Sequence, residues 1–243
     1  MGMEEGRCEL PEIPSEGPTI DQVLEEFLAE QEVRLAARTF LQYQAVVDLL
    51  RTYIEAYDGP DDPALVKVVD EAHQRGTEYA WCGLGSPKEI AYTIGHFLGW
   101  FMVRKVVAGQ DLMRAAGSVT RRLGRWLYEH HYMDETNAEI FQSQAKSLGR
   151  ALPKATDLRN KLSRWVDGLG GIRSDASYEG DFEIVAITDR GWKLEGVDSA
   201  LSGEISVPSE LRHGPEVGWR ISGVVARMSQ SFRWVEIWNV YPR

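Results

Sequence analysis

Three arginines have the residue type and spacing that most clearly suggest binding chemistry. Arg121, Arg122 and Arg125 fall within five consecutive positions of an expected helix. At 100° per residue they share the face opposite that helix's apolar side chains. A guanidinium group can donate two parallel hydrogen bonds to phosphate oxygens, so this face is a candidate for phosphate contact. The alternative is a solvated polar face, with Glu129 pairing with Arg125 one turn away.

Other basic residues are further candidates for nucleic-acid contact. Lys161 and Arg164 point away from the apolar face of a later helix, and Arg38 lies near the start of an earlier one. Solubilising charge is the favoured interpretation for Lys161 and Arg164. Next to Arg38, Thr39 is expected to act as a helix N-cap rather than to contact a nucleic acid.

No motif for catalysis, metal binding or cofactor binding is recognisable. HExxH and CxxC are absent, and the two cysteines, Cys8 and Cys82, have no suitably spaced partners. His130 and His131 are adjacent on an expected helix, so their side chains do not converge on one ion. The Gly83–Gly85 segment before a helix is better explained as part of a helix start than as an anion-binding loop. We therefore expect no cofactor and no metal, and the sequence nominates no general acid or base.

The charge is distributed unevenly along the chain. The 243 residues have a formal net charge of -10, but residues 82–175 hold 14 basic and nine acidic side chains. Such a balance argues against indiscriminate coating of nucleic acid, while the basic middle is compatible with one local phosphate-facing surface. No apolar run approaches the ~20 residues that span a bilayer. Together with the lack of a secretory leader and of a disulfide framework, this predicts a cytoplasmic protein without membrane contact.

Helical periodicity dominates the first 170 residues. Residues 1–17 are rich in Pro, Gly and acidic side chains and are expected to be a flexible tail. Thr19–Gln22 has the spacing of a capping box that starts the first helix. Further helices are expected to begin near 37, 64, 87 and 118, and two more to cover 135–150 and 153–168, with Pro153 in the first turn of the last one.

After the glycine-rich segment 168–171, the apolar period changes from 3.6 to 2. Five short strands are expected at 182–188, 192–196, 204–207, 219–228 and 232–241, the size of a small SH3-like or OB-like β-barrel. Its last strand is apolar on both faces. We therefore expect aromatics such as Trp219, Trp234 and Trp238 to dock on the helices or to contact a protein partner.

The helical part resembles the SAM-like core-binding domain of tyrosine recombinases (phage integrases) over about residues 19–133. The matching features are Phe27-Leu28 at the end of the first helix, Ala37-Arg38-Thr39 at the start of the next, Tyr43 after it, and Thr120, Arg121-Arg122 and Trp126-Leu127 in a later helix. The resemblance implies a helical bundle that clamps DNA.

The chain departs from that family after residue 133. No histidine is followed by arginine three residues on, and the last 110 residues are too short and too β-rich for the recombinase catalytic domain. Tyr241 is therefore not expected to act as a nucleophile. The overall prediction is an α+β protein with a tail (1–17), a core-binding-like domain (18–133), a helical extension (134–170) and a five-stranded barrel (178–243).

The expected function is that of a non-enzymatic DNA-binding or DNA-associated accessory protein. The alternative is a protein-interaction or assembly module that uses the bundle and the barrel as docking surfaces, because a fold does not fix a function. An enzyme is the third possibility. The sequence does not indicate an oligomeric state.

Overall fold

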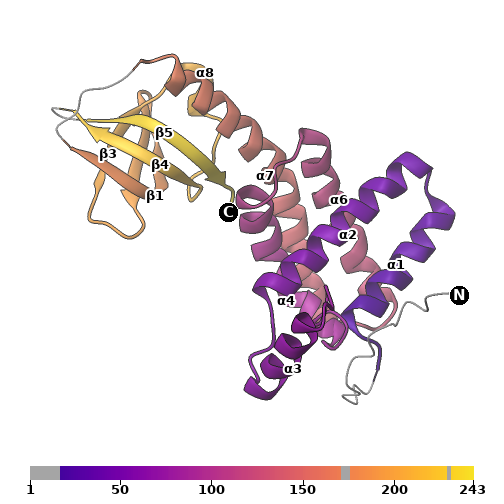
Figure 1. Cartoon of the computed structure of the whole chain (residues 1–243). Coiled ribbons are helices and arrows are strands. Elements are labelled where there is room, and N and C mark those ends of the chain that lie inside the picture. Colours follow the sequence, from indigo (N-terminus) through magenta and orange to yellow (C-terminus); the bar gives the residue numbers. More distant parts are fainter. Residues whose placement is uncertain (1–16, 171–175, 229–230) are drawn as a thin grey trace, which may run out of the picture. The chain divides into compact units, whose positions relative to one another are not determined.

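The computed structural model describes residues 17–170, 176–228 and 231–243. It confirms the α+β class, with helices in the N-terminal and middle parts and a closed five-stranded β-barrel at the C-terminus (Figure 1). The segment expected to be a tail lies, except for Gly17, outside the described residues. The chain forms two compact units. The first unit holds the residues up to Phe97 together with Ser118–Ser143, and the second unit holds Leu98–Gly117 and Gln144–Arg243. These units cut across the ranges expected from the sequence.

The first unit begins with helices α1 (Ile20–Arg34), α2 (Ala37–Tyr57) and α3 (Pro63–Gln74). The capping box is confirmed: the Thr19 hydroxyl accepts from the Gln22 amide at 3.3 Å, and the Gln22 side chain accepts from the Thr19 amide at 3.0 Å. The prediction that Thr39 caps α2 was wrong. The N-cap is Ala36, which provides no side-chain hydrogen bond, and Thr39 lies within the first turn.

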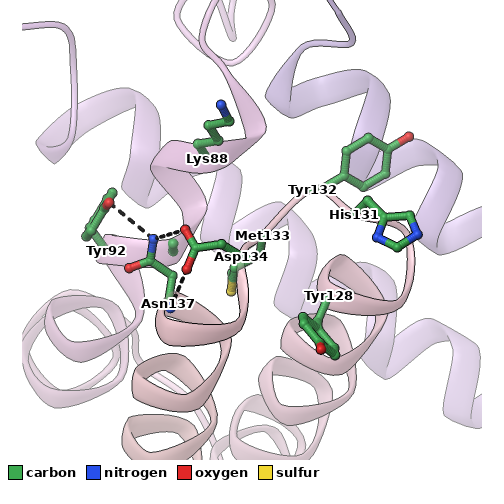
Figure 2. Close-up of a pocket in the computed structure, with 9 residues that line it drawn as sticks. Lys88, Tyr92, Tyr128, His131, Tyr132, Met133, Asp134 and Asn137 are labelled. Carbon is green, nitrogen blue, oxygen red and sulfur yellow. Dashed lines mark hydrogen bonds between the residues drawn. The ribbon is translucent and has the colours of Figure 1, made fainter.

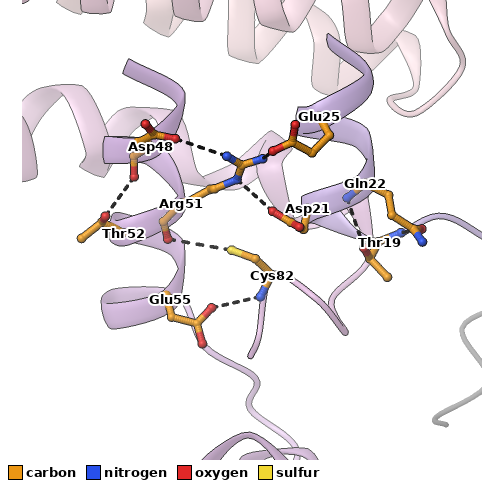
Figure 3. Close-up of polar contacts among 9 residues, drawn as sticks. All are labelled: Thr19, Asp21, Gln22, Glu25, Asp48, Arg51, Thr52, Glu55 and Cys82. Carbon is orange, nitrogen blue, oxygen red and sulfur yellow. Dashed lines mark hydrogen bonds and ion pairs between the residues drawn. The ribbon is translucent and has the colours of Figure 1, made fainter. Parts of the chain in front are cut away.

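Buried charge ties α1 and α2 to the loop that follows α3 (Figure 3). Arg51 is only 6% exposed, and its guanidinium group pairs with Asp21 at 2.9 Å, with Asp48 at 3.2 Å and with Glu25. One turn later, Glu55 accepts hydrogen bonds from the backbone amides of residues 81 and 82 at 2.8 and 3.0 Å. These bonds fix the loop that leads into η1 (Pro87–Glu89) and α4 (Ile90–His96).

Two long helices contribute residues to both units. After η2 (Phe97–Phe101) and α5 (Met102–Arg104) come α6 (Gln110–Glu129) and α7 (Glu135–Asp167). The expected helix start near residue 118 was wrong, because α6 already begins at Gln110. The expected pair of helices over 135–168 is the single 33-residue helix α7, with Pro153 in its interior. Proline removes one backbone hydrogen bond, and the apolar side chains buried on both sides of it outweigh that loss.

The barrel closes in the strand order β1-β2-β3-β5-β4, with β3 and β5 parallel and the other neighbours antiparallel. The strands are β1 (Ser177–Ile187), β2 (Gly191–Gly196), β3 (Ser202–Ser206), β4 (Arg220–Arg227) and β5 (Phe232–Tyr241), with the short helix α8 (Ser209–Arg212) between β3 and β4. In this order β5 lies between β3 and β4, so the barrel is not a simple up-and-down meander.

The barrel and the C-terminal half of α7 share one hydrophobic core. Leu158, Leu162 and Val166 of α7 belong to the same buried cluster as Trp192, Trp219 and Trp234 of the barrel. The Arg159 side chain adds a hydrogen bond to the backbone carbonyl of residue 238 at 3.0 Å. Across the described ranges, none of the helices combines the length and the apolar character needed to cross a membrane.

Candidate functional site

The three expected arginines line one hollow in the first unit. Arg121, Arg122 and Arg125 of α6 surround a cavity of about 350 Å³ together with Tyr43, Ser118 and Gln142. The Gln142 side-chain amide of α7 donates to the backbone carbonyl of Arg121 at 2.9 Å and so fixes one wall. On the opposite face of α6, Val119, Leu123, Trp126 and Leu127 are buried, which orients the arginines outward. We call this cavity the arginine hollow.

The side chains that line the arginine hollow carry more positive than negative charge. No carboxylate lines it, and within the described residues Arg121 and Arg125 make no ion pair. Arg122 is the exception, because Glu129 lies 4.0 Å from its guanidinium group. The expected alternative, a pair between Arg125 and Glu129, does not form. Two arginines with free donors around one cavity can bind an anion with several acceptor oxygens, such as a phosphate group.

A second hollow, of about 420 Å³, continues the first one between α6 and α7. It shares Arg125 and Gln142 with the arginine hollow and adds Tyr128, Glu135 and Glu139. The helices approach closely here because Gly124 has no side chain: a Cβ at this position would lie 2.2 Å from the Phe141 ring. The two glutamates make this middle hollow mixed in charge.

A third cavity, of about 430 Å³, begins at Tyr128 and is rich in tyrosine (Figure 2). Tyr92 and Tyr128 are 69% and 45% exposed. Asn137 donates to the Asp134 carboxylate from its backbone amide at 2.9 Å and from its side chain at 2.7 Å, and these bonds lower the pKa of Asp134. The other lining residues labelled in Figure 2 are Lys88, His131, Tyr132 and Met133. We call this cavity the tyrosine pocket.

The three cavities form a continuous groove along α6 because each shares a residue with the next. From Ser118 to His131 the groove is about 20 Å long at a helical rise of about 1.5 Å per residue. Arginines stand at one end, exposed tyrosines at the other, and carboxylates at the edge formed by α7. We call this surface the α6 groove.

The remaining predicted contact residues lie elsewhere. Arg38 is exposed in the first turn of α2 and lines none of the three cavities. In the second unit, Lys161 pairs with Asp157 at 2.6 Å, and the Arg164 side chain donates to the backbone carbonyl of Asn160 at 3.2 Å. These contacts match the interpretation of Lys161 and Arg164 as solvated charges on a helix.

The predicted docking aromatics are placed mainly in the barrel core. Trp219 and Trp234 are 1% and 0% exposed, and both belong to the cluster shared with α7. Trp238 is half-buried. Neither Trp219 nor Trp234 can therefore offer its side chain to a partner without unfolding of the barrel.

Sequence reasoning missed several residues of the groove. The packing of α6 on α7 brings Ser118, Tyr128 and Gln142 into the lining of the groove. No local sequence pattern predicts this packing. It also missed a second cluster, in which Glu26 and Glu30 of α1 meet His130. Glu26 and Glu30 are one helical turn apart, but the histidine follows 100 residues after Glu30.

Comparison with known proteins gives no match: no family model, no curated protein and no solved structure resembles the chain. The resemblance to the recombinase core-binding domain therefore stays a prediction from the sequence. The site has to be interpreted from its own geometry.

Proposed function

We propose that this chain is a non-enzymatic, cytoplasmic DNA-binding protein that holds a DNA strand along the α6 groove. The observation that carries the proposal is the arginine hollow, where three arginines of one helix surround a cavity without a carboxylate. A phosphate group seated there would accept hydrogen bonds from Arg121 and Arg125, whose guanidinium groups have no ion-pair partner among the described residues.

The other end of the groove supports contact with unpaired bases. Tyr92 and Tyr128 expose most or much of their rings around the tyrosine pocket. Exposed aromatic rings beside a positively charged track are the combination that single-stranded nucleic acid uses, with phosphates on the cations and bases stacked on the rings. A groove of about 20 Å accommodates about six nucleotides at the 3.4 Å strand spacing of duplex DNA, and fewer if the strand is stretched.

Among the described residues, the β2–β3 face of the barrel adds no comparable surface. OB folds bind oligonucleotides mainly on the face formed by strands 2 and 3. Here Lys193 and Glu195 are the exposed side chains in the middle of β2, and Glu204 of β3 accepts a hydrogen bond from Thr188 at 2.6 Å. The proposal therefore rests on α6 and not on the topology of the barrel.

A protein-interaction module is the second candidate. The observation that favours it is the pair of carboxylates, Glu135 and Glu139, in the middle hollow next to Arg125. Alternating charges along one groove suit a peptide that carries both signs, whereas they repel part of a DNA strand. Failure of DNA binding in the experiment below would leave this candidate in place.

The test is a fluorescence-anisotropy titration with short single-stranded and duplex DNA at two salt concentrations. Replacing Arg121, Arg122 and Arg125 together with alanine should weaken binding to all sequences. The slope of log K against log salt should fall by about 0.7 per lost contact for a single strand and about 0.9 for duplex DNA.

A charge-matched control separates the groove from the general effect of charge. Arg34, Lys67 and Arg75 are exposed, lie in the same unit and line none of the three cavities. Their triple alanine variant should keep the wild-type affinity within about a factor of two, as expected for cations outside the contact. Equal loss in both triple variants, or no binding by the wild type, would exclude the α6 groove as a DNA site.

A further inference from the structure

A second cluster in the first unit brings two carboxylates and an imidazole together. Glu26 and Glu30 lie one turn apart on α1, and His130 follows the last turn of α6. One donor atom of each residue lies within 4.8 Å of the other two. The distance between the His130 Nε2 atom and the Glu30 Oε1 atom is 3.0 Å. None of the three residues lines a cavity of the α6 groove, although Tyr132, which contacts Glu26, also lines the tyrosine pocket.

The surrounding residues hold all three side chains in place. The His130 Nδ1 atom lies 3.0 Å from the Trp126 backbone carbonyl, which can only accept, so Nδ1 donates this hydrogen bond and a bound ion would take the place of the proton between Nε2 and Glu30. The Trp126 indole donates to the second oxygen of Glu30 at 2.9 Å, and the Tyr132 hydroxyl donates to Glu26 at 2.8 Å. Histidine ligands of metal ions usually have their other nitrogen bonded to a carbonyl or carboxylate in this way.

Packing makes the arrangement rigid. Trp126 is fully buried, and its ring stacks on the His130 imidazole at a centroid distance of 4.1 Å. The imidazole therefore cannot rotate away without losing both the stacking and the Nδ1 hydrogen bond. The side chains of His130 and Glu30 are 32% and 40% exposed, which leaves a path for an ion from solvent.

We propose that Glu26, Glu30 and His130 bind a divalent transition-metal ion, with Zn²⁺ as the reference ion. Two ligands at about 2.1 Å from one metal lie about 3.0–3.4 Å apart for right-angled or tetrahedral geometry. The separation of 3.0 Å between His130 and Glu30 already meets this requirement. One nitrogen and two carboxylate oxygens suit zinc, iron or manganese, while calcium prefers a shell made of oxygen alone.

Such an ion would link α1 directly to the end of α6. Three protein ligands leave at least one position for water or another ligand, so the site is not the closed four-ligand type. The ion would also offset the negative charge of the two glutamates. This ion site lies apart from the arginine hollow, because the two have no residue in common.

The test uses the untagged full chain, stripped with a chelator and then titrated with Zn²⁺ in a calorimeter. Binding of one ion per chain is expected, together with a rise in the melting temperature. His130→Ala should abolish binding at this site, and Tyr132→Phe should weaken it by about tenfold, the lower end of the effect of an outer-shell partner. His213→Ala removes an exposed histidine outside the cluster, and this matched control should bind like the wild type.

X-ray absorption on the zinc-loaded protein identifies the ligands directly. A shell of nitrogen and oxygen atoms is expected, and a sulfur ligand would assign the ion to a cysteine instead. If His130→Ala does not fold, Glu26→Gln on the exposed side of α1 replaces it, with the same expected loss of affinity. Absence of metal binding by the wild type, or unchanged affinity in the folded variants, would show that His130 and Glu30 form only an ion pair.

Discussion

In the second unit the backbones of α6 and α7 touch at two glycines. This contact predicts that a glycine-to-alanine substitution destabilises the protein, the opposite of its usual effect inside a helix. Gly117 of α6 lies against Gly149 of α7, backbone to backbone. Replacing a glycine inside a helix with alanine normally stabilises the protein by about 0.8–1.0 kcal/mol. We expect Gly117→Ala to destabilise it, because the added methyl group has no room.

The size of the effect follows from the distances. A Cβ atom at residue 117 would lie 2.5 Å from the Gly149 Cα atom and 2.8 Å from its carbonyl oxygen. Non-bonded carbon atoms prefer about 3.5–4.0 Å, so one helix backbone has to move by about 1 Å. Overpacking of this kind costs about 1–3 kcal/mol. Since the neighbour is backbone and cannot rotate away, we take the upper end, for a net loss of about 2 kcal/mol after the gain in helix propensity.

Thermal unfolding followed by circular dichroism measures this loss. For a chain of this length, about 2–4 °C is lost per kcal/mol, so the melting temperature should fall by about 4–8 °C. Gly99→Ala is the control, because a Cβ there would lie at an ordinary 3.7 Å from the Leu148 side chain. Its melting temperature should stay the same or rise slightly. A Gly117→Ala protein as stable as the wild type would refute the close approach of the two helices.

Two further predictions concern buried side chains. Leu162→Ala in the core shared by α7 and the barrel should lower the free energy of unfolding by about 2–5 kcal/mol. Tryptophan fluorescence and circular dichroism should still report one common unfolding transition for the second unit. Two separate transitions would mean that the helix and the barrel unfold independently. Burial, with Glu55 nearby, raises the pKa of the Cys82 thiol. In a Cys8→Ser variant, where Cys82 is the remaining cysteine, the native protein should therefore react with a thiol reagent at pH 8 only as fast as it unfolds. Rapid labelling of the native protein would contradict the burial of Cys82.

The elements that local signals define were predictable from the sequence. The Thr19 capping box, the break between α1 and α2 and the five strands with their turns depend on residues close together in the chain. The outward face of Arg121, Arg122 and Arg125 also follows from the helical period and the apolar residues opposite. Short-range physics is sufficient for these features because each is fixed within a few turns or one hairpin.

The features that depend on packing were not predictable. Pro153 and Gly117 indicated helix boundaries from their own preferences, whereas in the structure neighbouring helices override both. Gly117 is used for close approach and not for a break. The cluster of Glu26, Glu30 and His130 needs α1 beside the end of α6, and the walls of the arginine hollow need α2 and α7. No spacing rule connects residues that lie 100 positions apart.

The division of the chain into units has a consequence for how its parts can be exchanged. The boundaries fall after Phe97, Gly117 and Ser143, and two of these three positions lie inside the helices α6 and α7. Neither unit is a single stretch of sequence, and no loop marks where one ends. A deletion or a gene fusion made at either of the boundaries inside α6 and α7 would leave a half-helix without its own core, so we expect that this chain has to be expressed and engineered as one piece.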